Sequence, residues 1–166
     1  MSVENSSGSF EQEPQQDPII QEILGDLYKP EKILAKKVEQ VSEGEFKITF
    51  EFPPYDRTIE PLDHVSMSQM HEAVLDGALC AIGQVLKNQS IKTNLDYQEF
   101  MDRRQDIIYY RENFSFRKML KANESTELIF QIVNVEEKKL RRTFYSATIK
   151  IDGFMRGEIE ALLEKV

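Results

Sequence analysis

The segment DHVSMSQMHEAVLDGALCAIGQVL, residues 63–86, begins with side chains able to do chemistry and continues as an almost unbroken apolar run. Acid, imidazole and hydroxyl groups open it, among them those of His64 and Ser66, and the amide of Gln69 follows one helical turn later. Such groups position water, move protons or stabilise charge on a carbonyl oxygen. We interpret the segment as an active site at the start of a buried helix, which we expect to end near Lys87.

The same polar side chains have a structural alternative. The first N–H groups of a helix have no partners within it, so Asp63, Ser66 or Ser68 is expected to act as the N-cap. Capping accounts for one of these residues and leaves the others to be explained.

A polar stripe continues into the helix. Gln69, Glu72 and Asp76 follow one another at helical spacings of three and four, beside His64 and His71. The stripe faces either solvent or a cleft at a subunit boundary. Glu72, close to the helix start, is favoured there by the helix dipole and by solvation.

Asp76 is the member of this stripe that is hardest to explain as surface. It lies between the apolar runs AVL and GALCAIG. A carboxylate in such surroundings loses its hydration, and its charged form is disfavoured unless it is paired. Two interpretations stay open: a buried hydrogen bond to a neighbouring strand, or a catalytic or orienting role.

Attack on a thioester is the chemistry that suits this layout. The N–H groups at a helix start can polarise an acyl carbonyl, and nearby polar side chains can position water or act as general base. Met67 and Met70 could line a channel for a fatty acyl chain, although ordinary core packing explains either one. Arg117 and Lys118 could hold the phosphates of a coenzyme, although such charges are usually solvated surface.

The elements around the helix indicate an α+β fold. From Ala73 to Leu86 apolar side chains occur on all sides of the helix, which is typical of a buried helix. The sequence offers no second long helix to cover it, so we expect a curved antiparallel sheet wrapped around one central helix, the hot-dog fold. Small residues on the helix are expected to let a strand backbone approach closely: Gly77, Ala78, Ala81 and Gly83.

Strand patterns are present on both sides of this helix. Alternating apolar residues in 33–52 predict two strands joined by a turn at SEG, after a short helix that begins at Pro18 and stops before Pro30. A short helical or irregular link near residues 95–106 is followed by about four further strands, which can form an antiparallel meander.

Composition limits the kinds of partner that the protein is expected to bind and the cellular compartment that suits it. The chain has 166 residues, a net charge of −8 and one cysteine, Cys80. This charge argues against nucleic acid as a partner, because phosphate binding needs a clustered positive surface. A single cysteine allows no internal disulfide and fits a reducing cytoplasm, and no apolar run approaches the roughly 20 residues needed to span a membrane. We expect a disordered tail over residues 1–18 and a single domain over residues 19–166.

The chain resembles the FcoT-like family of hot-dog thioesterases, which act on long-chain acyl-CoA. The resemblance rests on DHVS at the helix start, on FRKMLK followed by a strand beginning STELIF, and on the closing IDGFMRGEIEAL. It covers the chain from about Leu24 to the C-terminus.

This resemblance implies a substrate, an assembly and several site residues. The substrate would be a thioester of CoA or of an acyl carrier protein, bound in a tunnel beside the helix of a homodimer or larger oligomer, with no metal and no separate cofactor. The family uses tyrosines and an asparagine near the helix start. The asparagine position falls on Ser66, one tyrosine matches Tyr55 in FPPYD and the other lies near Tyr28. His64 follows the family pattern directly.

Two other functions stay open. One is a different hot-dog reaction, namely hydration or dehydration of an enoyl thioester, or amine addition to one. Dehydration is less favoured, because His64 is followed by VSM and not by the Phe-Pro-Gly of the dehydratase pattern. The other is an acyl-binding module without catalysis.

Overall fold

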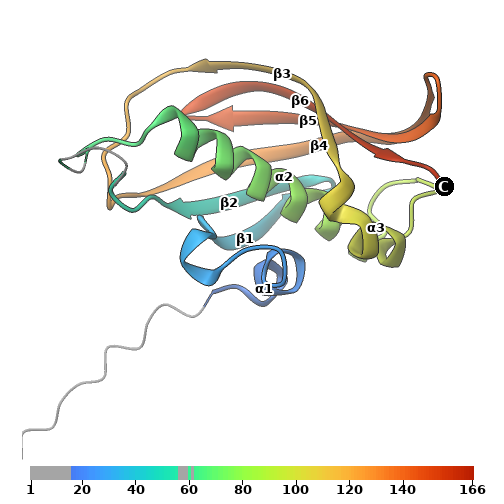
Figure 1. Ribbon diagram of the computed structural model, residues 1–166, viewed down its shortest axis with the longest axis horizontal. Helices are drawn as coiled ribbons and strands as arrows, with labels where there is room; N and C mark the ends of the chain where they lie inside the picture. The colour runs from blue at the N-terminus through green and yellow to red at the C-terminus, as the bar shows by residue number, and fades with distance from the viewer. Residues whose placement is uncertain (1–15, 56–59, 61) are drawn as a thin grey trace, which may run out of the picture.

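The computed structural model describes residues 16–55, 60 and 62–166. Its elements, shown in Figure 1, are α1 (Pro18–Leu24), η1 (Pro30–Lys32), β1 (Ala35–Ser42), β2 (Glu45–Glu51), α2 (Met67–Asn88), α3 (Tyr97–Arg103), η2 (Arg104–Asp106), β3 (Ile108–Phe116), β4 (Ser125–Lys139), β5 (Thr143–Gly153) and β6 (Met155–Glu164).

The strands form one antiparallel sheet in the order β1-β2-β4-β5-β6-β3. The sheet curves around α2, which lies along its concave face (Figure 1). In β2 the alternating side chains of Phe46, Ile48 and Phe50 all point into the core, as their period of two predicts. The predicted hot-dog fold is confirmed, and α2 matches its expected span to within one residue.

The last four strands depart from a simple meander. β4, β5 and β6 pair with their neighbours in sequence, but β3 pairs with β6 and not with β4. The chain therefore places β3 at the far edge of the sheet, where it passes over α2 (Figure 1). Its outer edge has no strand beside it within the described chain.

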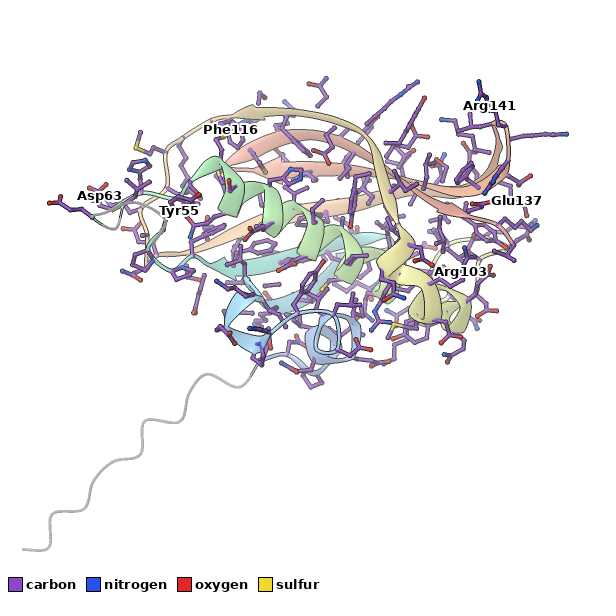
Figure 2. All side chains as sticks on the ribbon, viewed as in Figure 1. Tyr55, Asp63, Arg103, Phe116, Glu137 and Arg141 are labelled. Carbon is purple, nitrogen blue, oxygen red and sulfur yellow. The ribbon has the colours of Figure 1, made fainter. Side chains whose placement is uncertain are left out.

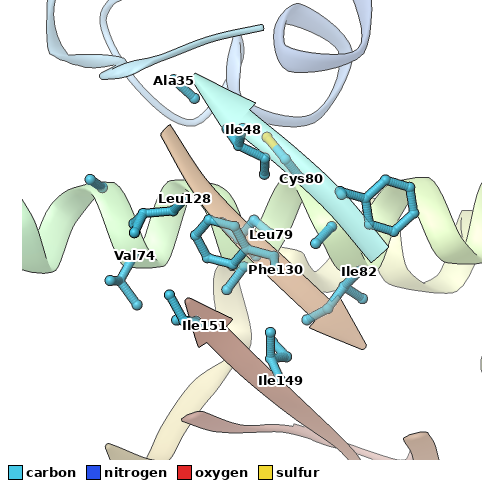
Figure 3. Packing of buried hydrophobic residues seen from close by; sticks show 14 of the residues in the cluster. Ala35, Ile48, Val74, Leu79, Cys80, Ile82, Leu128, Phe130, Ile149 and Ile151 are labelled. Atoms are coloured by element: carbon cyan, nitrogen blue, oxygen red, sulfur yellow. The ribbon is translucent and has the colours of Figure 1, made fainter. Parts of the chain in front are cut away.

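The core forms between α2 and the inner face of the sheet. Val74, Leu79 and Ile82 of the helix meet the side chains of β4 and β5, including Phe130 and Ile149 (Figure 3). Burial of this apolar surface is the main stabilising contribution to the fold.

Gly77 and Gly83 of α2 make room for side chains and not for strand backbones, which corrects the expectation from the sequence for these two residues. A Cβ at Gly77 would lie 2.1 Å from Cζ of Phe130, so the glycine makes room for an aromatic ring. A Cβ at Gly83 would lie 2.4 Å from Cδ1 of Ile23, on α1. Ring and methyl groups fill the space because close packing in a core is achieved by interdigitated side chains.

Replacing this glycine tests the packing. Gly77→Ala should lower the free energy of unfolding by about 1 to 3 kcal/mol, because the Phe130 ring cannot move aside in a filled core. Gly83→Ala is the matched control, and it should cost less because the flexible end of Ile23 can rotate away. Urea unfolding of both variants measures the difference, and equal stability of Gly77→Ala and the wild type would contradict the packing described.

The N-terminal part of the described chain is bonded to β1. Asp17 caps α1, and its second carboxylate oxygen accepts the N–H of Val38 at 3.2 Å. Gln16 donates from its amide to the carbonyl of Ala35 at 3.0 Å. The predicted disordered tail otherwise falls on residues 1–15, which lie outside the described residues. None of the helices in the described segments is long and apolar enough to cross a membrane.

Candidate active site

The start of α2 is closed by a capping box. Ser66 is the N-cap, and its Oγ accepts the backbone N–H of Gln69 at 3.2 Å. The side chain of Gln69 accepts the N–H of Ser66 at 3.0 Å and donates to the carbonyl of Pro53 at 2.6 Å. These bonds satisfy end groups that the helix itself cannot satisfy. The geometry therefore gives Ser66 and Gln69 the structural role considered for the polar cluster.

Removing the hydroxyl of the N-cap residue should lower the stability of the protein. Ser66→Ala is expected to lower the free energy of unfolding by about 1 kcal/mol, because the N–H of Gln69 loses its acceptor. Ser68→Ala, at the second position of the same helix and exposed, should be close to neutral. Thermal unfolding of the pair measures this, and equal melting temperatures would refute a capping role for Ser66.

His64 and Tyr55 lie in the loops that precede α2. Nδ1 of His64 is 3.1 Å from a carboxylate oxygen of Asp63, and the His64 side chain is partly exposed. Its backbone forms an isolated bridge with Lys121. Tyr55 forms a similar bridge with Leu62, and Figure 2 shows Tyr55 and Asp63 at the same end of the molecule. This end therefore brings together Tyr55, His64, Ser66 and Gln69.

Asp76 lies further along α2 in a different environment. Its residue is only 5% exposed, and Oδ2 accepts the backbone N–H of Leu34 at 3.1 Å, just before β1. Burial raises the pKa of Asp76 to about 7, against the opposing effect of the N–H groups of Leu34 and Ala35. The charge of Glu72 adds to the rise. The buried bond to a strand that the sequence suggested is thus present, and the carboxyl still titrates near neutral pH.

Two tyrosines accompany Asp76. Tyr28, from the segment between α1 and η1, has a raised pKa, first because of burial and then because of the charges of Asp76 and Glu72. Tyr109, on β3, donates its hydroxyl to the carbonyl of Leu75 at 3.5 Å. Burial raises the pKa of Tyr109, and the charges of Tyr28 and Asp76 raise it further. These groups therefore converge on one side of α2 from three separate parts of the chain.

Tyr109 was not singled out by sequence reasoning. It belongs to the pair Tyr109–Tyr110, and a period-two pattern shows only that one of the two faces inward. The run IIYY does not indicate which of the two tyrosines faces inward, because all four residues suit either face of a sheet.

The predicted site residues thus form two groups. Ser66 and Asp76 are ten positions apart on the same helix, a separation of about 15 Å along its axis. One group surrounds the helix start, and the other consists of Asp76, Glu72, Tyr28 and Tyr109. An open groove of about 340 Å³ is lined by Leu34 and Pro53, whose backbones bond to Asp76 and Gln69, and not by the members of either group themselves.

The predicted acyl-channel methionines differ in exposure. Met67, at the first position of α2, is 62% exposed, whereas Met70 is buried in the core cluster. Core packing accounts for Met70. Met67 is available to a substrate or to another chain.

Arg117 and Lys118 line a separate open groove of about 550 Å³ at the end of β3. The guanidinium of Arg117 lies 3.3 Å from a carboxylate oxygen of Asp152. Ser125 and Thr126 contribute hydroxyl groups to the same groove. No group of three or more potential metal ligands is found in the residues that the structure describes.

No protein-family model matches this chain, and no curated protein matches it. Solved structures do match. An HP0420 homologue from Helicobacter felis is 11% identical with a TM-score of 0.51, over 90% of this chain and 91% of that chain. Cj0977, a sigma28-regulated virulence protein from Campylobacter jejuni, is 10% identical with a TM-score of 0.50, over 93% and 97%. A putative thioesterase from Shewanella oneidensis is 7% identical with a TM-score of 0.49, over 87% and 91%. At these identities the likeness shows the fold alone, and the FcoT-like assignment stays a prediction.

Proposed function

We propose that the protein hydrolyses acyl thioesters and that Asp76 is the general base. The observation that carries the proposal is a buried carboxyl on the central helix whose pKa lies near 7. A base with such a pKa is substantially ionised at neutral pH and still holds a proton strongly enough to accept one from water.

The reaction follows from this group in two steps. The Asp76 carboxylate takes a proton from a water molecule while the water oxygen forms a bond to the thioester carbonyl carbon, and negative charge moves to the carbonyl oxygen. As the carbonyl re-forms, the carbon–sulfur bond breaks, and the Asp76 carboxyl returns its proton to the departing thiolate. The products are a carboxylic acid and a free thiol, and Asp76 is regenerated.

A second copy of the chain supports this chemistry. The N–H groups at the start of α2 are too distant from Asp76 to act on the same carbonyl within one protomer. No strand of the described residues pairs with the outer edge of β3, and the two ends of this strand carry the exposed apolar side chains of Ile108 and Phe116. A copy paired along this edge by a two-fold axis runs its α2 in the opposite direction. In the proposed dimer, the partner's helix start, with its own His64 and Ser66, approaches Asp76 from the other side.

The substrate class rests on two features. A groove with Arg117 and Lys118 at its rim suits the phosphates of CoA, although Asp152 already pairs with the arginine. Tyr28, which is 40% exposed beside Asp76, lies where a substrate would enter from solvent. The preference for long acyl chains rests on the FcoT-like resemblance. An acyl carrier protein could replace CoA, because both carry the acyl group as a phosphopantetheine thioester.

Thiol release tests the proposal. The purified protein is mixed with acyl-CoA of increasing chain length, and free thiol is detected with a chromogenic disulfide while products are identified by mass. We expect one acid and one thiol for each thioester consumed. An enoyl-CoA that gains water or an amine without releasing thiol would assign the alternative hot-dog reaction, and binding without any product would assign an acyl-binding module.

A further inference from the structure

The adjacent tyrosines of β3 face opposite sides of the sheet. Tyr109 pairs with Ala161, whose side chain is buried in the core, and a bulge follows between Tyr109 and Arg111. Tyr110 is 47% exposed, and Cζ of Arg111 and Nζ of Lys138 lie 5.4 and 5.3 Å from the centre of its ring. The inward residue therefore extends toward α2, over which β3 passes in Figure 1.

The hydroxyl of Tyr109 has a poor hydrogen-bond partner. Its contact with the Leu75 carbonyl, at 3.5 Å, is at the outer limit for an O–H···O bond. That carbonyl also accepts the N–H of Leu79 in the regular helix pattern. Buried tyrosine hydroxyls usually make a shorter bond, so this one is free to donate to a better acceptor.

The position of this hydroxyl relates it directly to the general base. The Leu75 carbonyl belongs to the peptide group that joins Leu75 to Asp76, so the phenol lies within one residue of Asp76 along the helix. Burial raises the pKa of this phenol first, and the charges of Tyr28 and Asp76 raise it further. The phenol thus keeps its proton over the whole working pH range and is able to donate a hydrogen bond.

We propose that Tyr109 contacts the substrate: its hydroxyl donates a hydrogen bond to the thioester carbonyl oxygen that becomes negative when water attacks. This inference rests on the proposed hydrolysis and adds a donor from the same protomer as Asp76. The bond strengthens as charge develops on the oxygen, which is the condition for lowering the barrier and not only for binding.

Turnover measurements give the first test. Tyr109→Phe should lower kcat by about tenfold to a hundredfold and leave KM within a factor of about three. Tyr110→Phe, one position along the same strand and on the opposite face, is the matched control and should keep wild-type rates. Circular dichroism and the melting temperature should be unchanged for both variants, because the lost hydroxyl makes no strong bond in the fold.

Binding of inert analogues gives the second test, with a readout that a structural role would not change. An S-(2-oxoalkyl)-CoA retains a carbonyl, whereas an S-alkyl-CoA of the same chain length has none. Tyr109→Phe should weaken the ketone analogue by a factor of about three by calorimetry, in line with the small change in KM, and leave the thioether unchanged. Equal weakening of both, or of neither, would overturn the contact. A wild-type protein that releases no thiol would refute the hydrolysis itself, whereas an active wild type with an unaffected Tyr109→Phe would refute only this residue's role.

Discussion

Asp76→Asn is expected to lower the rate of thioester hydrolysis about a thousandfold. The amide has the shape of the carboxyl and its oxygen still accepts the N–H of Leu34, so the start of β1 stays in place. The variant cannot take a proton from water, and its own protons are not released at neutral pH. Asp102→Asn, on the exposed face of α3, is the matched control and should retain wild-type activity.

The pH dependence of catalysis should report the same group. In the wild type, kcat/KM should rise with pH and level off above a midpoint near 7, since only ionised Asp76 accepts a proton. The titratable groups that interact with Asp76 are Glu72 and Cys80 on α2, together with Tyr28, Lys36 from β1 and Tyr109 from β3. Both tyrosines titrate above the range examined. A flat profile between pH 5.5 and 8.5, or an active Asp76→Asn, would exclude Asp76 as the base.

As the pH rises through 7, the stability of the wild type should fall while its activity rises. The pKa of Asp76 is raised from 3.8 to about 7 in the fold, so the native state binds this proton more tightly than the unfolded chain does. The contribution of Asp76 to stability is therefore full below pH 4 and is lost as the pH rises to 7. The Asp76→Asn variant has no such group to ionise, so its free energy of unfolding does not fall in this way above pH 7. The difference amounts to about 4 kcal/mol at most. Urea unfolding at pH 5 and pH 8 should show Asp76→Asn gaining on the wild type at the higher pH.

The fold was predictable because its main signals are local. Helix α2 is apolar on every side, and such a helix needs a cover that only the surrounding strands could supply. The alternation in Phe46, Ile48 and Phe50 likewise fixed the inner face of β2. The place of β3 at the sheet edge was not predictable, because pairing with β6 depends on contacts between segments far apart in sequence.

The candidate site was predictable only in part, for a related reason. Asp76 could be recognised because a carboxyl among apolar neighbours is unusual at the level of sequence. For the polar cluster around Ser66 the sequence left both capping and catalysis open, and hydrogen-bond geometry makes Ser66 and Gln69 a helix cap. Tyr109 could not be recognised, since its function depends on which face of β3 turns toward α2. A tertiary contact decides the orientation of Tyr109, whereas the capping bonds between Ser66 and Gln69 are local and join residues three apart in sequence.

Substitutions at the edge of β3 are expected to have the other large effect on activity. Ile108 and Phe116 stand near its two ends and are 56% and 40% exposed. In the proposed dimer, antiparallel pairing of β3 with its copy brings each end of the strand close to the opposite end of the partner strand. Lysines on an edge strand oppose such pairing by charge repulsion and by their need for hydration. The double variant Ile108→Lys, Phe116→Lys should therefore be monomeric and should lose at least about a hundredfold in activity, because Asp76 then lacks the partner's helix start.

Light scattering during size-exclusion chromatography measures the assembly, and thiol release measures activity on the same fractions. Val41→Lys is the control for an added lysine: it places one positive charge on β1, the opposite edge of the sheet, at an apolar position that is 55% exposed. This control should stay dimeric and active. A wild type that is monomeric and hydrolyses thioesters would show that one protomer holds a complete site. In that case the carbonyl would depend on donors beside Asp76, and the loss in Tyr109→Phe should be greater than in a dimer whose partner shares the charge.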